Sequence, residues 1–237
     1  MTLAENIQKV QARIAAAAEQ AGRDPSEVTL VAATKVQTSD TIRQAIAAGV
    51  TICGENRVQE MTTQHWQDGA YEGAKVHFIG HLQKNKLKYL VGKVDLIESV
   101  DSEELIRLID KRAQNLGIVQ DILIEVNIGG EASKSGVKPE EVEALVALAA
   151  SLPGVEPRGL MAIPPVAQEP GANRAVFAAM RQLFIDIKGK TYNNKVNIDC
   201  LSMGMSGDFE DAIAEGATQV RVGTALFGAR PANRVNG

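Results

Sequence analysis

The feature that most constrains this chain is a regular alternation of short apolar runs and longer amphipathic segments. Eight β-rich runs are predicted, at residues 28–34, 50–53, 76–79, 94–99, 120–127, 155–162, 197–202 and 218–222. Seven helical patterns lie between them, at 39–48, 56–66, 83–91, 102–116, 139–151, 172–187 and 208–215, and a short last helix begins at Thr224. Several runs are apolar throughout, which is typical of parallel strands covered on both faces. Eight βα units predict an α/β fold of the (β/α)8 TIM-barrel type.

The predicted barrel spans residues 28–228, and an extra amphipathic helix over residues 1–22 precedes it. The chain has 237 residues, of which 45% are hydrophobic and only 4% aromatic, so we expect one domain over 1–237 with an aliphatic core. The alternative is an open doubly wound sheet. Its dinucleotide fingerprint, GxGxxG after the first strand, is absent from this sequence.

Charge and cysteine use exclude several classes of partner. A net charge of −4 gives no general attraction to nucleic acid or to an anionic membrane. No apolar run approaches the length of a membrane span, and the leading helix does not read as a signal peptide. Cys53 and Cys200 fall in predicted strands without a CxxC spacing, so we expect reduced core residues of a cytoplasmic protein. His77 and His81 have no carboxylate that completes a ligand set, and we expect no metal site.

Lys35 follows the apolar run from Val28 to Thr34, at the carboxyl end of the first predicted strand. In α/β proteins the chemistry is found at this edge of the sheet. Desolvation there lowers the pKa of an ammonium group toward the neutral, nucleophilic form. Such a lysine can form a Schiff base with a carbonyl compound or with pyridoxal phosphate. The alternative is a strand-end lysine that merely extends to water.

Small and hydroxyl residues after the last two strands predict an anion site. Ser206 is expected to cap the helix that begins at Phe209, and Gly223 and Thr224 open the short last helix. Two helix N-termini after strands seven and eight form the usual phosphate site of a TIM barrel. Ordinary capping combined with a tight turn is the alternative explanation.

Arg221 lies at the end of the eighth strand, where a permanent charge needs a partner or a ligand. Beside a pyridine nitrogen, arginine would donate a hydrogen bond and keep that nitrogen unprotonated, which weakens the ring as an electron sink. The alternative is an internal salt bridge to Asp199 or Glu125. Two further residues each have two possible roles. His81 could line the mouth of the site or be a loop histidine with its hydrogen bonds satisfied, and Lys134 could face an anion or solvent.

Seven segments of the chain resemble the pyridoxal phosphate homeostasis protein family, known as YggS in bacteria and as PROSC or PLPBP in animals. The matching segments are residues 30–35, 54–60, 77–86, 131–136, 159–164, 201–206 and 221–228, which run in order along nearly the whole chain. The family resemblance implies a TIM barrel similar to the N-terminal domain of alanine racemase. This agrees with the fold that the strand pattern predicts independently.

The resemblance also implies a set of residues that bind pyridoxal 5′-phosphate: Lys35, Asn56, Ser206, Arg221, Gly223 and Thr224. In that reading Lys35 carries the cofactor as an internal aldimine, and Ser206, Gly223 and Thr224 hold its phosphate.

Arg221 would face the ring nitrogen, and Asn56 would flank the cofactor. Arg57 departs from the residue that many relatives carry, and it lies beside the site. Family members are mostly described as carriers and regulators of vitamin B6 and amino-acid pools, so the implied function is homeostasis of the cofactor, with apo forms of cofactor-dependent enzymes as candidate partners.

Racemisation needs a base on each face of the bound amino acid. Lys35 could serve one face, and in the similar racemases the other base is a tyrosine from a second, β-rich domain. This chain ends within about ten residues of the last helix, so we expect that domain to be missing and the protein to be a monomer. The three tyrosines, Tyr71, Tyr89 and Tyr192, are predicted to lie on the periphery of the barrel.

The sequence therefore favours a cofactor-binding protein without catalytic residues. A racemase of low activity is one alternative. Another is an aldolase that uses Lys35 on a phosphorylated sugar, which would need an acid–base carboxylate. Only Glu125 is expected to point inward at the matching strand ends.

Overall fold

The strands of the chain close into a barrel. The structure is a computed structural model that describes residues 2–131, 134–165, 169, 171–190 and 197–228. Within these residues the strands are β1 (Thr29–Ala33), β2 (Ile52–Glu55), β3 (Lys75–Phe78), β4 (Leu96–Val100), β5 (Gln120–Val126), β6 (Val155–Ala162), β7 (Cys200–Ser202) and β8 (Gln219–Val222). Each pairs in parallel with the next along the chain, and β8 pairs with β1. The predicted TIM barrel is confirmed, and the open doubly wound sheet is excluded because the sheet has no free edge.

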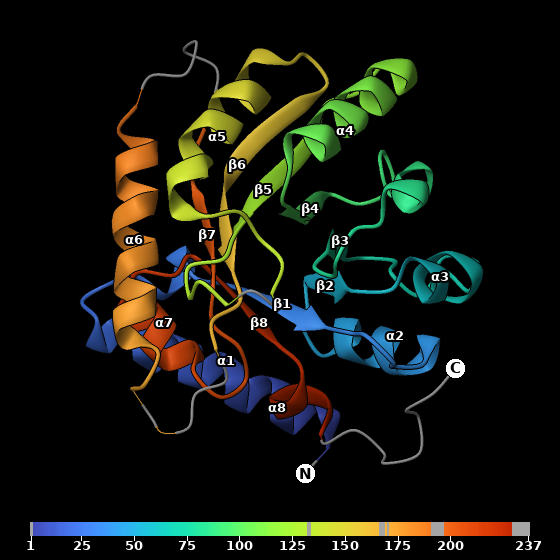
Figure 1. The fold of residues 1–237 in the computed structure, drawn as a ribbon. Coiled ribbons are helices and arrows are strands. Elements are labelled where there is room, and N and C mark those ends of the chain that lie inside the picture. The colour runs from blue at the N-terminus through green and yellow to red at the C-terminus, as the bar shows by residue number, and fades with distance from the viewer. Residues whose placement is uncertain (1, 132–133, 166–168, 170, 191–196, 229–237) are drawn as a thin grey trace.

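Helices surround the strands on all sides (Figure 1). They are α1 (Leu3–Gln20), α2 (Ser39–Ala47), α3 (Val58–Glu60), α4 (Glu103–Leu116), α5 (Val142–Ser151), α6 (Arg174–Lys188), α7 (Phe209–Ala214) and α8 (Thr224–Phe227). Shorter 3₁₀ or π turns are η1 (Pro25–Glu27), η2 (Met61–His65), η3 (Lys84–Tyr89) and η4 (Pro139–Glu141). This order places the loops that follow the strands together at one end of the barrel, where the sequence predicts the site.

Two predicted helices differ in type from what the structure contains. The segment 56–66 forms the single turn α3 followed by the π-helical η2. The hydroxyls of Thr62 and Thr63 donate to the carbonyls of Val58 and Gln59, so side chains occupy acceptors that a regular helix would use. In the segment 83–91, residues 84–89 form the 3₁₀ turn η3, and the buried residues of the segment are Leu87, Leu90 and Val91. They lie only toward its C-terminal end, so the segment lacks an apolar stripe along its whole length of the kind that stabilises an α-helix against a core.

The leading helix α1 lies beside α7 and α8, which are the last helices of the chain (Figure 1). Its N-terminus is held by a capping box in which Thr2 and Glu5 bond to each other's backbone. Ile7, Val10 and Ile14 form the buried face at helical spacing. Hydrogen bonds from α1 to α7 and α8 fix its position against these helices.

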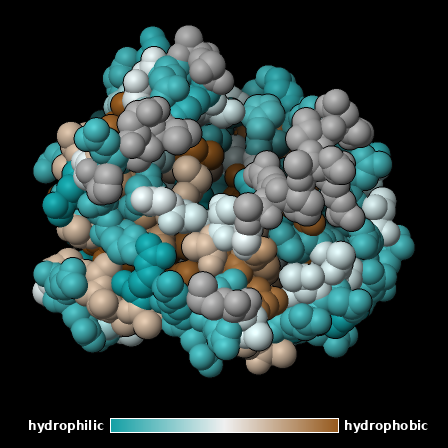
Figure 2. Space-filling view, turned by 90° about the horizontal axis from the view of Figure 1, so that it is seen from below, coloured by the Kyte–Doolittle hydropathy of each residue, from teal (hydrophilic) through white to brown (hydrophobic). Residues whose placement is uncertain are grey.

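Two polar contacts tie α1 to the C-terminal helices. The side chain of Asn6 donates to the carbonyl of Leu226 at 2.9 Å, and Arg13 pairs with Glu210 on α7 at 2.5 Å. The surface seen from below is mainly hydrophilic, with hydrophobic residues visible in the gaps between hydrophilic ones (Figure 2). Among the described helices, none has the length and apolar character needed to cross a bilayer.

Candidate functional site

A pocket of about 500 Å³ opens at the carboxyl ends of the barrel strands. This volume lies in the range of small-molecule sites, and the position is where TIM barrels carry their chemistry. All six residues predicted to bind a cofactor line it: Lys35, Asn56, Ser206, Arg221, Gly223 and Thr224. The barrel therefore brings together side chains that are almost 190 positions apart in the sequence, by the count from 35 to 224.

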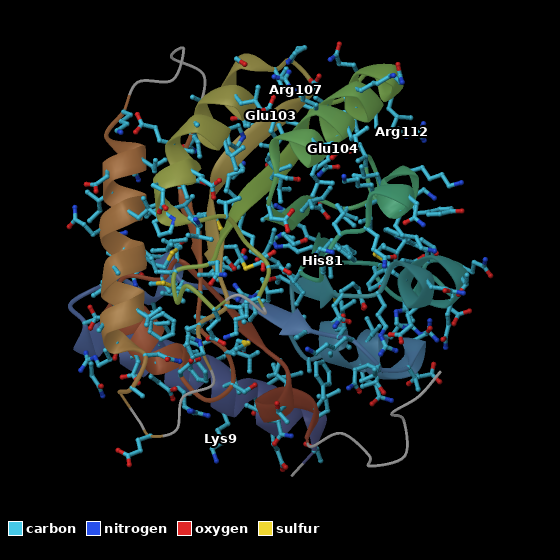
Figure 3. All side chains as sticks on the ribbon, in the orientation of Figure 1. Lys9, His81, Glu103, Glu104, Arg107 and Arg112 are labelled. Atoms are coloured by element: carbon cyan, nitrogen blue, oxygen red, sulfur yellow. The ribbon has the colours of Figure 1, made fainter. Side chains whose placement is uncertain are left out.

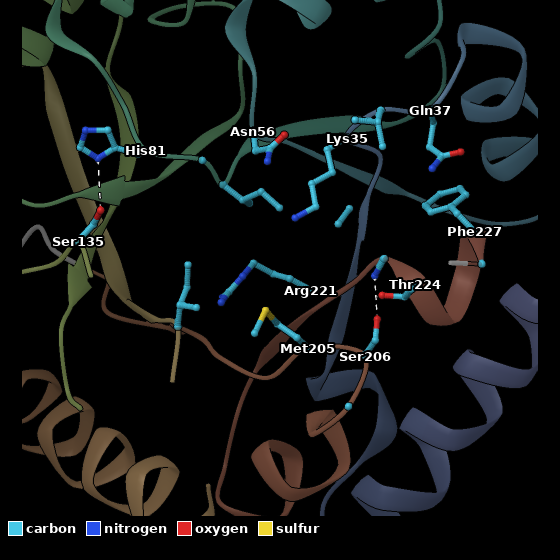
Figure 4. A pocket seen from close by; sticks show the side chains of 18 of the residues that line it. Lys35, Gln37, Asn56, His81, Ser135, Met205, Ser206, Arg221, Thr224 and Phe227 are labelled. Carbon is cyan, nitrogen blue, oxygen red and sulfur yellow. Dashed lines mark hydrogen bonds between the residues drawn. The ribbon is translucent and has the colours of Figure 1, made fainter. Parts of the chain in front are cut away.

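Lys35 reaches into the pocket from the loop after β1, and Arg221 enters from the neighbouring strand β8 (Figure 4). The pairing of the two strands explains this arrangement, since Val31 on β1 lies opposite Arg221 on β8. Ser206 and Thr224 lie to one side of the lysine (Figure 4). The amine of Lys35, the guanidinium group of Arg221 and two hydroxyls consequently face one space.

Asn56 follows β2 and has a buried side-chain oxygen, Oδ1, without a hydrogen-bond partner among the described residues. An orphaned buried polar atom in a pocket indicates that a ligand completes its hydrogen bonding. Gly80, in the loop after β3, packs directly on Asn56: a Cβ atom at position 80 would lie 2.4 Å from the Asn56 carbonyl oxygen. Only glycine permits this close approach, which holds Asn56 in the wall of the pocket. Arg57 is half-exposed, pairs with Glu60 at 2.9 Å and is not among the lining residues.

Ser206 does not cap the helix at Phe209, contrary to the sequence prediction. The N-cap of α7 is Asp208, and the Oδ1 atom of this residue accepts a hydrogen bond from the Met205 amide at 2.7 Å. The Ser206 hydroxyl instead accepts from the backbone amides of Gly223 at 3.1 Å and Ala225 at 3.3 Å. Ser206 therefore joins the loop after β7 to the start of α8, and its hydroxyl keeps one hydrogen to donate to a ligand.

Arg221 is buried, with 4% of its surface exposed. Its Nη1 atom donates to Ser202 Oγ at 2.6 Å and its Nη2 atom donates to the Ala162 carbonyl at 2.8 Å. The carboxylate nearest to it is Glu98, at 4.0 Å. The predicted alternative partners were wrong: Asp199 pairs with Arg158 at 2.6 Å, and no ion pair joins Arg221 to Glu125 within the described residues.

Comparisons with known proteins agree with this geometry. A sequence profile described as "Alanine racemase, N-terminal domain" matches residues 3–231. The pyridoxal phosphate homeostasis protein of Aquifex aeolicus is 46% identical over 235 residues, which are 97% of this chain and 99% of that protein. The protein of the same name from Pseudomonas aeruginosa is 44% identical, over 97% of this chain and 96% of its own. The chain belongs to the pyridoxal phosphate homeostasis protein family.

A solved structure adds to this family assignment. PipY of Synechococcus elongatus, determined with PLP bound, superposes with a TM-score of 0.82 at 32% identity and covers 96% of this chain and 100% of that one. A structural neighbour of this chain has therefore been determined with PLP bound.

In this member of the homeostasis family, a buried hydrogen-bond network fixes Arg221. This network was not predicted from the sequence. Glu98 on β4 accepts hydrogen bonds from Ser202 at 2.6 Å and from Gln219 at 2.7 Å, and His77 contacts it at 2.9 Å. Burial alone would raise the pKa of Glu98, but His77, Arg221 and Ser202 together bring that pKa below its usual value. A glutamate inside the apolar segment Leu96–Val100 was the available signal, because a buried charge requires partners.

His77 thus has a carboxylate neighbour, which the sequence analysis did not expect. The pair does not extend to a metal site: among the described residues, no group of three His, Cys, Asp or Glu side chains could hold an ion. Cys53 is buried in β2, Cys200 begins β7, and neither is in a disulfide. Burial raises the pKa of the Cys53 thiol to about 12, which suppresses thiolate reactivity.

Glu125 on β5 is the one acidic residue that lines the pocket in the described part of this homeostasis-family chain. Burial raises its pKa to about 7; the charge of Asp101 adds to the effect and Arg221 opposes it. A carboxyl group with this pKa exchanges protons near neutral pH. The sequence indicates an inward-pointing Glu125, but its titration depends on burial that a sequence does not reveal.

The two remaining candidates, His81 and Lys134, differ in their relation to the pocket. His81 lines the pocket, and its Nδ1 atom lies 3.4 Å from Ser135 Oγ, so the loops after β3 and β5 meet there (Figure 4). Lys134 is not a lining residue and pairs with Glu131 in its own loop at 3.0 Å.

No tyrosine lines the pocket within the described residues. Tyr89 is on the surface, as predicted, and Tyr192 lies outside the described residues. Tyr71 is buried instead of peripheral, and it bonds to Glu55 at the end of β2 at 2.9 Å.

Proposed function

We propose that this chain binds pyridoxal 5′-phosphate as a Schiff base on Lys35 and acts in vitamin B6 and amino-acid homeostasis without evident catalytic turnover. The relatives in Aquifex aeolicus and Pseudomonas aeruginosa carry the name of this role. PipY was solved with PLP bound. The observation that carries the proposal is the convergence of Lys35, Arg221 and the Ser206–Thr224 corner on one pocket.

The residues of the pocket fit such a ligand. Pyridoxal phosphate, when bound, supplies an aldehyde that condenses with an amine and a ring that withdraws electrons. Lys35 provides the amine. Ser206, Gly223 and Thr224 offer hydroxyls and backbone to the anionic phosphate, in a pocket that also holds the charge of Arg221.

Arg221 would hold the ring nitrogen, since two hydrogen bonds on the far side already fix the guanidinium group. An arginine there keeps the nitrogen unprotonated and so limits electron withdrawal by the ring. The orphaned Oδ1 atom of Asn56 gives the ligand a further polar contact. Both features favour holding the cofactor over fast removal of a proton from an amino acid.

Glu125 favours a second candidate, a cofactor-dependent racemase of low activity. It supplies a group able to accept a proton near neutral pH in the same pocket. Incubation of the loaded protein with several amino acids in deuterated water distinguishes the two functions. Rapid deuterium incorporation at the α-carbon would favour the racemase, and its absence the carrier.

We further propose that the protein is a cytoplasmic monomer that passes its cofactor to apo-enzymes. Two free, largely buried thiols agree with a reducing compartment. Size-exclusion chromatography with light scattering tests the monomer. Activation of a cofactor-free aminotransferase by the loaded protein, compared with an equal amount of free cofactor, tests the transfer.

The central experiment is chemical trapping. Pyridoxal 5′-phosphate is added to the purified protein, the visible absorption band is recorded, and borohydride reduction is followed by peptide mapping. We expect the adduct on Lys35 and loss of both band and adduct in Lys35→Ala. Lys9→Ala is the matched control, because Lys9 projects from α1 on the outside of the molecule (Figure 3). An adduct on another residue, or a colourless protein, would refute the proposal; a colourless protein that traps a phosphorylated sugar on Lys35 would favour an aldolase.

A further inference from the structure

The loop that carries Lys35 has an unusual backbone. Val36, the next residue, has φ = 61°, and it is the only non-glycine residue with positive φ in the described part of the chain. A β-branched residue in this left-handed region costs free energy, and it persists only where the surroundings hold it. The neighbours on either side, Lys35 and Gln37, both line the pocket.

One segment, residues 55–71, forms hydrogen bonds with this loop. Thr34 Oγ1 donates to Glu55 Oε1 at 2.5 Å, directly before Lys35. The Val36 amide donates to Glu60 Oε2 at 3.3 Å, directly after it. The lysine is thus bracketed by two residues that bond to carboxylates of the same segment.

His65 makes the third contact, with the carbonyl of Gln37 at 3.1 Å from its Nε2 atom. A carbonyl only accepts, so Nε2 must carry a hydrogen. The other ring nitrogen, Nδ1, lies 2.9 Å from the Tyr71 hydroxyl, which donates its single hydrogen to Glu55 Oε1. With an ionised Glu55, Nδ1 then donates to the tyrosine oxygen, and His65 is an imidazolium.

The surrounding groups support a charged His65. Burial lowers its pKa, but the hydrogen bond and charge of Glu55, the Gln37 carbonyl and the charge of Glu60 raise it above its usual value on balance. The other titratable groups packed here are Tyr71 and Cys53, and burial raises the pKa of each, so both are neutral. Glu55 Oε1 lies 3.5 Å from His65 Nδ1, so the imidazolium is the positive charge paired with this carboxylate among the described residues.

We propose that His65 and Tyr71, together with Glu55, are positioning residues that hold the Lys35 loop in its strained conformation and make bond formation at Lys35 sensitive to pH. The inference rests on the proposed function of Lys35. When His65 loses its Nδ1 proton, Tyr71 has one hydrogen for two acceptors, so one hydrogen bond is lost and the loop loosens. The stabilisation of the Lys35 loop by His65 is complete below the ordinary histidine pKa. It is lost as the pH rises through the raised pKa of His65.

Amide hydrogen exchange on the protein without added cofactor tests whether these residues stabilise the conformation of the Lys35 loop. We expect the amides of Val36 and Gln37 to exchange about tenfold faster in Tyr71→Phe and in His65→Gln, since one hydrogen bond to a charged group is worth roughly a factor of ten. Tyr89→Phe, at an exposed tyrosine, is the matched control. Equal exchange in Tyr71→Phe, His65→Gln and the control would overturn the proposal.

The pH profile of trapping at Lys35 tests the consequence. We expect wild type to form the reducible adduct about tenfold faster than His65→Gln at pH 6, and the ratio to fall toward one by pH 9. A merely structural role for His65 would give a ratio independent of pH, which would contradict the proposal. If wild type forms no Lys35 adduct, the proposed function fails, while the exchange measurement still decides whether the positioning cluster exists.

Discussion

At the scale of single residues, the buried position of Glu125 lowers the stability of the folded protein when this carboxyl group is ionised. Burial raises its pKa from 4.5 to about 7, so the folded protein holds a proton that the unfolded chain releases. A pKa raised in the folded state gives stability that is fully present below the unfolded pKa and is lost as pH rises through the folded one. At 1.36 kcal/mol for each pKa unit, the loss above pH 7 amounts to about 3 kcal/mol.

We therefore expect Glu125→Gln to be more stable than wild type by up to about 3 kcal/mol at pH 8 and equally stable at pH 4.5. Urea unfolding at a series of pH values measures the difference. Glu140→Gln, at an exposed position of η4, is the matched control. A stability difference that does not change with pH would show that Glu125 does not titrate as described.

Burying the charge of Arg221 without partners would cost free energy. The surrounding hydrogen-bond network offsets this cost and also orients the guanidinium group. Its guanidinium group lies between a serine, a backbone carbonyl and the Glu98 carboxylate. Burial lowers its pKa, while the charges of Glu98 and Glu125 act in the opposite direction. These contacts fix where the guanidinium group points and thereby which ligand atom it can meet.

At the scale of elements, Ser202 joins three strands. It lies on β7, donates to Glu98 on β4 at 2.6 Å and accepts from Arg221 on β8 at 2.6 Å. We expect Ser202→Ala to lower the free energy of unfolding by about 1–3 kcal/mol, because two buried charged groups each lose a hydrogen bond. We also expect weaker binding of pyridoxal 5′-phosphate, because Arg221 is no longer held.

Urea unfolding and absorbance titration measure the two effects separately. Ser151→Ala is the control, because Ser151 is exposed at the end of α5 and its hydroxyl donates to the backbone of its own helix, at the Leu148 carbonyl. A destabilised Ser202→Ala that binds the cofactor as tightly as wild type would mean that Arg221 does not contact it.

The elements around the site also explain its geometry. The loop after β1 is tied to the end of β2 by Thr34 and Glu55, and the loops after β7 and β8 are tied by Ser206 and Gly223. The two ties lie on the sides of the pocket that carry the lysine and the hydroxyls. These two parts of the pocket are therefore each held by a contact between neighbouring βα units.

At the scale of the whole molecule, α1 covers the barrel next to the last helices of the chain. We propose that residues 1–22 and the barrel over 28–228 unfold as one unit, since the buried face of α1 belongs to the same core as the strands. Replacing Ile7 by alanine, at a position with no exposed surface, should cost about 2–5 kcal/mol.

Two probes test this cooperativity. Trp66, the single tryptophan, follows η2 on the β2–β3 connection, whereas circular dichroism reports on all helices including α1. In Ile7→Ala both signals should change at one, lower urea concentration. Leu108→Ala, at a partly exposed position of α4, should shift the midpoint much less. Separate transitions for the two probes would refute a single folding unit.

The sequence by itself determined the barrel and the location of the site. The order of apolar runs and amphipathic segments is a local property, and in a parallel barrel with right-handed connections that order also sets which strands are neighbours. The loops after strands one, two, seven and eight must therefore meet, so Lys35, Asn56, Ser206 and Gly223 could be assigned to one pocket before any coordinates.

Only the tertiary structure decided how the polar groups are paired. Glu98 and Ser202 are 104 positions apart, and their contact depends on side chains that cross the barrel interior. The hydrogen bond between Tyr71 and Glu55 also depends on the tertiary structure. The sequence pattern predicted Tyr71 at the periphery of the barrel, whereas the structure buries it against Glu55. Hydrogen bonds and pKa values depend on distances of a few ångströms and on burial, whereas a sequence pattern specifies only which face of an element is apolar.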